Sequence, residues 1–140
     1  MTDDITLNKA ATIERCVKRI REDYKGFEDE FETDHTRQDA IILNLQRACE
    51  ASIDLANHWV RFLKLGIPQT SRESFSLLVK GKILPESLSK RLQSMVSFRN
   101  IAVHDYTRMN LVIVRKIIEV HLDEFLEFTK TLIKASAAKP

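Results

Sequence analysis

The chain has 140 residues, of which 44% are hydrophobic and 30% charged, and its formal net charge is +2. This length and composition predict one globular domain over 1–140, with its core over about 6–134, and they exclude a disordered chain. Only three glycines and three prolines interrupt it, which favours long helices over many short strands.

The remaining bulk features indicate a soluble cytoplasmic protein with no membrane partner. Cys16 and Cys49 are the only cysteines, too few and too far apart for a disulfide framework or a zinc site. The acidic start of the chain lacks the basic-then-apolar pattern of a signal peptide. No apolar run approaches the roughly 20 residues that cross a bilayer.

The first predicted helix extends from about 6 to 31, because its apolar residues recur at spacings of three and four. Asp34 or Thr36 is suited to cap a second helix that runs to about 65. The expected buried face of the first helix contains Ile13, Cys16, Val17, Ile20, Tyr24 and Phe27.

The second predicted helix is apolar over about half of its circumference and polar over the rest. Its polar stripe either faces solvent or faces a partner or an active-site groove. Glu50 and Asp54 belong to this stripe and are supporting site candidates. The stripe consists of Arg47, Glu50, Asp54, Asn57, His58 and Arg61.

Capping and breaking signals divide the rest of the chain into shorter helices. Gly66 and Pro68 stop the second helix, and the capping box that begins at Thr70 starts a third, which Gly81 ends. Pro85 suits the first turn of a fourth helix, and Asn110 suits the cap of the last one. No segment alternates with period two, so we expect an all-α, up-and-down bundle of four or five helices.

The residues best suited to phosphate binding and proton transfer lie in one short segment, Arg99-Asn100-Ile101-Ala102-Val103-His104-Asp105-Tyr106. Arginine is always charged and donates two parallel hydrogen bonds, which suits a phosphate, and histidine suits proton transfer near neutral pH. Residues 80–116 hold eight Lys or Arg against two acids, a net +6, whereas residues 1–34 hold six against ten, a net −4. A basic segment around the motif favours a polyanionic substrate, although it also fits a solvated helix face.

Helical geometry separates the two motif residues. Arg99 and His104 are five residues apart, which puts their side chains about 140° apart on a straight helix. Either the helix ends near Val103, so that His104 and Tyr106 lie on a turn, or the site takes its Arg and His from two copies of the chain. A two-fold homodimer brings the same patch together twice.

These residue types fit metal-independent RNA cleavage. A base must take the proton of the 2′-hydroxyl, an acid must protonate the leaving oxygen, and a cation must stabilise the developing charge. No His, Cys or carboxylate set has metal-ligand spacing, so we expect no metal and no cofactor. His121 lies on an apolar stripe and is expected to be a core histidine.

The pattern Arg99-x-x-x-x-His104-x-Tyr106 resembles the signature of HEPN-domain toxins, and more narrowly of the HepT toxins paired with MntA-like nucleotidyltransferase antitoxins. The connector Leu65-Gly66-Ile67-Pro68 with Ser71, and the segment around Glu50 and Asp54, are similar to that subfamily. The resemblance covers roughly residues 35–125.

The resemblance implies a helical homodimer that acts as a metal-independent ribonuclease toxin of a type VII toxin–antitoxin system. It implies Arg99 and His104 as catalytic residues, and AMPylation of Tyr106 by the antitoxin as the neutralising step. Asn100 is a supporting candidate that would orient the phosphate or His104. The alternative function is a non-catalytic helical module that scaffolds a nucleotidyltransferase or binds nucleotide.

Overall fold

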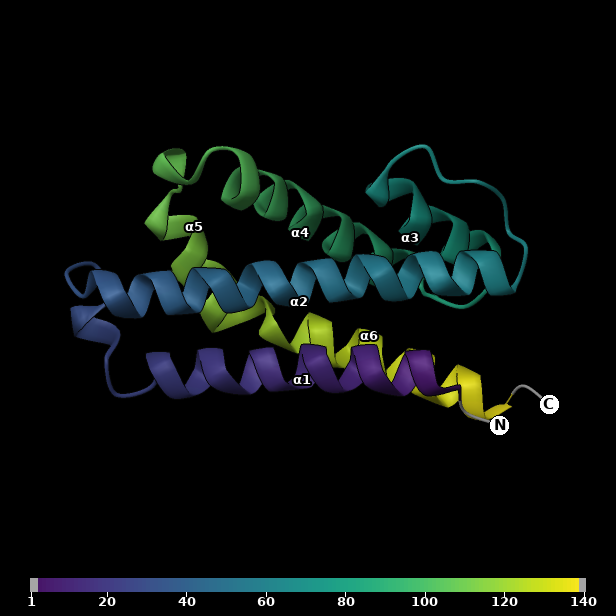
Figure 1. Ribbon diagram of the computed structural model, residues 1–140, viewed down its shortest axis with the longest axis horizontal. Coiled ribbons are helices and arrows are strands. Elements are labelled where there is room, and N and C mark those ends of the chain that lie inside the picture. The colour runs from purple at the N-terminus through teal and green to yellow at the C-terminus, as the bar shows by residue number, and fades with distance from the viewer. Residues whose placement is uncertain (1–2, 139–140) are drawn as a thin grey trace.

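The computed structural model describes residues 3–138, which form helices and no strand (Figure 1). The predicted all-α bundle is therefore confirmed. The helices are α1 (Asp4–Tyr24), the 3₁₀ turn η1 (Glu28–Glu30), α2 (His35–Phe62), α3 (Ser71–Lys80), α4 (Glu86–His104), the 3₁₀ turn η2 (Tyr106–Arg108), α5 (Leu111–Lys116), the π-helical turn η3 (Ile117–His121) and α6 (Leu122–Ala138).

The long helices α1 and α2 run antiparallel, and α6 packs mainly along α1 (Figure 1). The helix α4 runs back along α2 on the other side of the bundle. The start of α1 and the end of α6 lie at the same end of the molecule, where the Asp3 backbone N–H donates to Ser136 Oγ at 3.1 Å. This arrangement places α4 and its motif on the outside of the bundle, against α2 and α3.

Capping residues set the helix starts, as the sequence predicts. Of the two candidates for α2, Asp34 is the cap, because its carboxylate accepts the backbone N–H of Arg37 at 3.0 Å. Thr70 Oγ1 accepts the N–H of Glu73, and Asn110 Oδ1 accepts the N–H of Val112. Each cap satisfies a backbone donor that the first helical turn leaves without an intrahelical acceptor.

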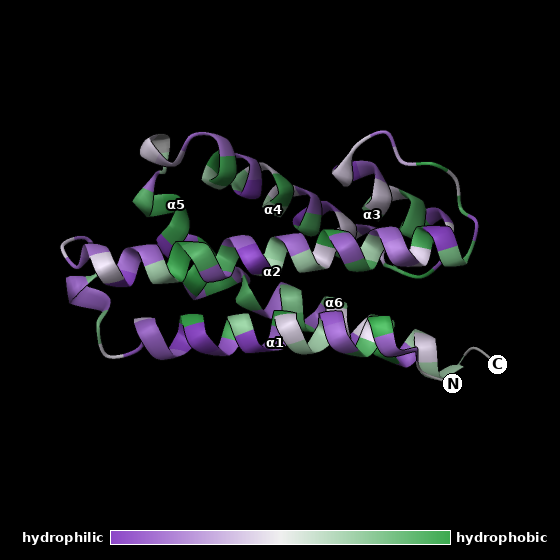
Figure 2. Cartoon of the chain, viewed as in Figure 1, coloured by the Kyte–Doolittle hydropathy of each residue, from purple (hydrophilic) through white to green (hydrophobic). Residues whose placement is uncertain are grey.

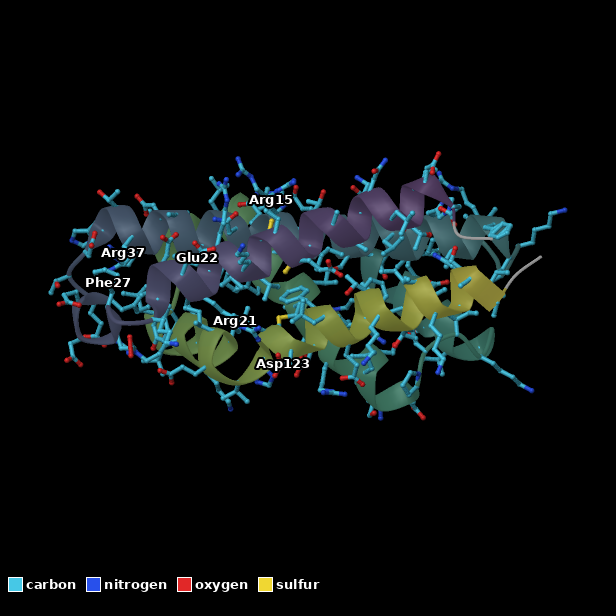
Figure 3. All side chains as sticks on the ribbon, turned by 90° about the horizontal axis from the view of Figure 1, so that it is seen from below. Arg15, Arg21, Glu22, Phe27, Arg37 and Asp123 are labelled. Carbon is cyan, nitrogen blue, oxygen red and sulfur yellow. The ribbon has the colours of Figure 1, made fainter. Side chains whose placement is uncertain are left out.

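The end of α1 differs from the sequence prediction. The helix stops at Tyr24, and Gly26 adopts a positive φ of +86°, which turns the chain into η1. Phe27 is consequently 38% exposed rather than buried, and the Arg37 guanidinium lies 3.5 Å from its ring centroid (Figure 3). Phe31 is fully buried instead, because the turn carries it back to the core.

The second helix ends three residues earlier than predicted, at Phe62. Lys64 and Gly66 have positive φ values of 54° and 132°, so the chain leaves the helical path before Leu65. Gly81 ends α3 as predicted. A Cβ atom on Gly81 would lie 2.7 Å from Leu65 Cδ1, which shows how closely this connector packs on the end of α3.

The last predicted helix begins after Asn110 but is not regular. The π-helical turn η3 separates α5 from α6, and such a turn inserts a residue and rotates the faces that follow it. His121, at the end of this turn, is half-buried, with its Nδ1 atom 2.6 Å from Glu124 Oε1. The ring is thus satisfied by a buried carboxylate, as expected of a core histidine, but it lies at the edge of the core rather than within it.

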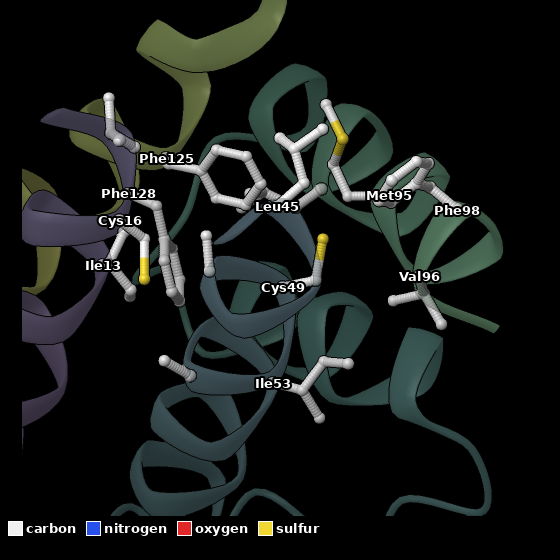
Figure 4. Packing of buried hydrophobic residues seen from close by; sticks show 14 of the residues in the cluster. Ile13, Cys16, Leu45, Cys49, Ile53, Met95, Val96, Phe98, Phe125 and Phe128 are labelled. Atoms are coloured by element: carbon white, nitrogen blue, oxygen red, sulfur yellow. The ribbon is translucent and has the colours of Figure 1, made fainter. Parts of the chain in front are cut away.

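The core fills the space between α1, α2, α4 and α6 (Figures 2 and 4). Cys16 and Cys49 are buried free thiols within it, as predicted. Trp59 is fully buried, and its indole N–H donates to Thr6 Oγ1 at 3.0 Å, so its polar atom is satisfied. The other large, fully buried aromatic side chains are Phe31, Phe75, Phe125 and Phe128.

Candidate functional site

The predicted motif occupies the C-terminal end of α4 and the turn that follows. Arg99 lies within the helix, His104 is its last residue, and Tyr106 begins η2. The helix closes at Asp105, whose backbone N–H donates to the carbonyl oxygen of Ile101 at 2.8 Å. The sequence thus folds the motif residues onto two adjoining elements.

Arg99 is half-buried, and its guanidinium is held from a neighbouring helix. Its Nη2 atom donates to Ser71 Oγ, in the first turn of α3, at 3.3 Å. Its Nε atom is buried and has no hydrogen-bond partner among the described residues. A guanidinium has five N–H donors, and those of its Nη atoms suit the binding of an anion such as a phosphate.

The positive charge of Arg99 also affects a buried thiol in the core. Burial raises the pKa of the Cys49 thiol to about 12, and the positive charge of Arg99 opposes that rise. Cys49 lies on α2 and points toward α4, beside Met95 (Figure 4). The electrostatic effect of Arg99 therefore extends to this buried thiol of α2.

His104 is exposed and makes no hydrogen bond within residues 3–138. No hydrogen bond joins its side chain to that of Arg99 in this described part of the chain. Both residues belong to one continuous helix, so their side chains leave it about 140° apart. The helix ends near Val103, as predicted, and Tyr106 lies on the turn that follows, whereas His104 is still the last residue of the helix. A site formed by two copies stays a prediction.

Tyr106 is 43% exposed, and its hydroxyl donates a hydrogen bond to Asp39 Oδ1 on α2. Partial burial, followed by this hydrogen bond and the negative charge of Asp39, raises the pKa of Tyr106 to about 12. The phenol is therefore neutral at physiological pH. Sequence reasoning did not find Asp39 or the Ser71 contact to Arg99, because each lies on another helix, 67 and 28 residues away from its partner.

The supporting candidates are dispersed. Asn100 is exposed on α4 next to Arg99. Glu50 accepts a hydrogen bond from Gln46 Nε2 at 3.0 Å on its own helix. Asp54 pairs with Lys9 Nζ of α1 at 3.2 Å, so its carboxylate joins α1 to α2 and contacts neither Arg99 nor His104. The roles of these three residues in the site stay predictions.

The polar stripe of α2 does not simply face solvent. Asn57 Oδ1 accepts a hydrogen bond from Ser74 Oγ of α3, and His58 Nε2 lies 3.3 Å from Asp3 Oδ1. Arg47 and Arg61 are exposed. Much of the stripe thus connects α2 to its neighbouring helices.

An apolar groove of about 420 Å³ lies between α4 and the α5–η3 segment. Phe98 and Ile101 line it from α4, and Ile113 and Ile117 line it from the other side. Ile101 and Ile113 are exposed, and so is the neighbouring Val112 on α5. The motif helix therefore borders a surface that leaves several apolar side chains in water.

Two further findings concern residues 3–138 as a whole. No three His, Cys, Asp or Glu side chains in this range gather in a way that would hold a metal ion. None of the helices in this range combines the length and apolar character needed to cross a membrane.

Comparison with known proteins identifies the family. Residues 13–132 match the family described as "Ribonuclease HepT-like". The chain is 52% identical to the "mRNA nuclease HepT" of Shewanella oneidensis over 126 residues, which cover 90% of this chain and 94% of that one.

Two solved structures agree with this assignment. A "tri-AMPylated Shewanella oneidensis HEPN toxin in complex with MNT antitoxin" is 51% identical with a TM-score of 0.89, covering 96% of this chain and 99% of that one. A "toxin-antitoxin with AMP-PNP" has the same identity and TM-score over 95% and 99% of the two chains. The predicted family is confirmed: the chain belongs to the HepT-like ribonuclease family.

Proposed function

We propose that this chain is the toxin of a HepT/MntA-like, type VII toxin–antitoxin pair and that it cleaves RNA in the cytoplasm without a metal. One observation carries the proposal. A guanidinium held by Ser71 and an exposed imidazole occupy the same helix end, in a chain 52% identical to an mRNA nuclease. The net +6 of residues 80–116 supports a polyanionic substrate.

The chemistry assigns one role to each catalytic residue. Arg99 binds the scissile phosphate and stabilises the charge that builds up on it. His104 takes the proton of the 2′-hydroxyl, and a second imidazole gives a proton to the leaving oxygen. Since each chain holds one such histidine in the motif, both proton transfers require two copies of the chain, which supports a homodimeric site.

The exposed apolar surface beside the motif supports the homodimer. Ile101 and Ile113 line the groove of about 420 Å³ next to α4, and the neighbouring Val112 is also exposed. Exposed apolar patches of this kind are typical of protein interfaces. A second copy seated there by two-fold symmetry would bring two copies of α4 close together. The Arg99 of one copy and the His104 of the other then share one cleft.

Neutralisation is proposed to take place at Tyr106. Its hydroxyl is exposed two residues beyond His104, where a nucleotidyltransferase antitoxin can reach it. A related toxin has been solved in a tri-AMPylated state with its MNT antitoxin. Each added AMP brings negative charge and bulk next to Arg99 and His104, and so competes with the RNA phosphate for the same groups.

The test is cleavage of RNA by purified protein in EDTA. The wild type is compared with Arg99→Ala and His104→Ala, and with the matched controls Arg61→Ala and His35→Ala, which remove exposed residues of the same types on α2. We expect each motif variant to lose at least about 100-fold in kcat/KM and each control to stay near wild type. Equal cleavage by all five proteins would remove the motif from the mechanism.

The same set of proteins tests the alternative of a non-catalytic binding module. In that case the purified wild type cuts no RNA, and growth arrest on expression is absent or persists in His104→Ala. Growth arrest that disappears in His104→Ala, together with RNA cleavage by the wild type, supports the ribonuclease.

A further inference from the structure

We propose that Asp39 is the general base that activates Tyr106 for AMP transfer, so that this chain supplies a catalytic group to its own modification. The inference rests on the proposed function, in which Tyr106 is the acceptor. Its direct support is the hydrogen bond from the Tyr106 hydroxyl to Asp39 Oδ1. Asp39 touches the atom that would react.

The geometry joins two elements that are distant in sequence. Asp39 lies in the second turn of α2, 67 residues before Tyr106 in η2. Both side chains are exposed, so an enzyme that carries a nucleotide can approach the pair from solvent. Among the side chains that the structure describes, no Lys, Arg or His forms an ion pair with Asp39, and the phenol is its hydrogen-bond donor.

The charges around the pair keep the phenol protonated until it reacts. Burial and the nearby carboxylate raise the pKa of Tyr106 to about 12. The other charged or titratable residues nearby in the sequence are His35 and Arg37, which precede Asp39, and His104, Asp105 and Arg108, which flank Tyr106. A neutral phenol is a weak nucleophile, so it needs a base in contact with its proton.

The step balances with a nucleoside triphosphate as the co-reactant. The Tyr106 oxygen forms a bond to the α-phosphorus of ATP, the bond from that phosphorus to the bridging oxygen breaks, and pyrophosphate leaves. The phenolic proton moves to Asp39 as the new bond forms and is then lost to solvent. Positioned carboxylates that take a proton in this way contribute about 10²- to 10⁴-fold to a rate.

The experiment measures the rate of AMP addition by intact-mass spectrometry, with the cognate nucleotidyltransferase antitoxin, ATP and Mg²⁺. The proteins are the wild type, Asp39→Asn, Asp39→Glu, Tyr106→Phe and the control Asp29→Asn, which changes an exposed aspartate of η1. We expect Asp39→Asn to slow the first addition at least about 100-fold at pH 7, Asp39→Glu to recover part of the rate, and Asp29→Asn to match the wild type.

The pH dependence separates a base from a structural role. In the wild type Asp39 can take the phenolic proton directly. In Asp39→Asn the phenol must first lose its proton to solvent, and the ionised fraction rises about tenfold per pH unit below its pKa. The ratio of the wild-type rate to the Asp39→Asn rate is therefore expected to fall about tenfold per pH unit. Because both proteins meet the same antitoxin, titration of the antitoxin cancels from this ratio. A constant ratio would mean that Asp39 only positions the ring.

The variants test separately whether Tyr106 is the acceptor and whether Asp39 is its base. If Tyr106→Phe still gains AMP at the wild-type rate, or if the wild type gains none, the proposed acceptor is wrong. If Tyr106→Phe loses the modification while Asp39→Asn is modified as fast as the wild type or faster, the acceptor stands and the role of Asp39 is overturned.

Discussion

The Nη2 atom of Arg99 donates a hydrogen bond to the Oγ atom of Ser71 at 3.3 Å, across 28 residues of sequence. This contact makes the first turn of α3 a support for the motif helix. Arg72, the next residue of α3, donates to Ser97 Oγ on α4, so two successive residues connect the first turn of α3 to the C-terminal half of α4. The first turn of α3 therefore supports the site although it contains none of the proposed catalytic residues.

We expect Ser71→Ala to reduce RNA cleavage by about tenfold in kcat/KM, because a hydrogen bond to a charged group contributes about 1.5–3 kcal/mol and part of it serves to position Arg99. Ser87→Ala, in the exposed first turn of α4, is the matched control and should cleave at the wild-type rate. Thermal unfolding should show that both variants fold. A full wild-type rate in Ser71→Ala would mean that Arg99 needs no support from α3.

We expect Ile113→Asp to prevent dimer formation. Ile113 is 53% exposed beside the apolar groove, and a buried unpaired carboxylate at an interface is strongly unfavourable. Ile67→Asp is the control, since Ile67 is 83% exposed in the connector at the other end of α2. Sedimentation velocity should give a monomer that has lost RNA cleavage for Ile113→Asp, and a dimer for Ile67→Asp and the wild type. A monomeric wild type that cleaves RNA would disprove the shared site.

We expect both tyrosines to ionise only in strong alkali. Burial, and then hydrogen bonds to Glu119 and Asp39, raise the pKa values of Tyr24 and Tyr106 to about 12. Near-ultraviolet absorbance of tyrosinate should rise near pH 12 in the native protein, and near pH 10 in the unfolded chain.

The same shifts predict how stability changes in alkali. Between about pH 10 and 12 the unfolded tyrosines lose protons that the native ones keep, so the free energy of unfolding falls as the pH rises through this window. Asp39→Asn should lower the pKa of Tyr106 toward 10 and leave that of Tyr24 unchanged. Native tyrosines that both titrate near pH 10 would contradict the hydrogen bonds described here.

We expect Thr6→Val to destabilise the fold by about 1–3 kcal/mol, because it leaves the buried indole N–H of Trp59 without an acceptor. It also removes the hydrogen bond from Thr6 Oγ1 to Asp3 Oδ2 at the start of α1. Urea unfolding followed by the fluorescence of Trp59, the only tryptophan, measures this change. In the control Thr12→Val the lost hydroxyl donates only to its own helix, and the effect should be well under half as large.

The sequence predicts well those features that depend on neighbouring residues. The caps Asp34, Thr70 and Asn110 start helices where expected, because a cap binds a backbone N–H only two or three residues away. The end of α1 was harder to predict. Periodicity continues through Phe27, but Gly26 turns the chain, and the core takes Phe31 instead.

The sequence by itself determined the helical class, the helix starts and the identity of the motif, since these depend on spacing along the chain. Only the tertiary structure decided that Ser71 holds Arg99, that Asp39 holds Tyr106, and that Asp54 pairs with Lys9 instead of joining the motif. Each of these contacts joins two helices. Which side chains meet across a helix pair depends on how the helices pack, and that packing is set by the whole core rather than by any short segment.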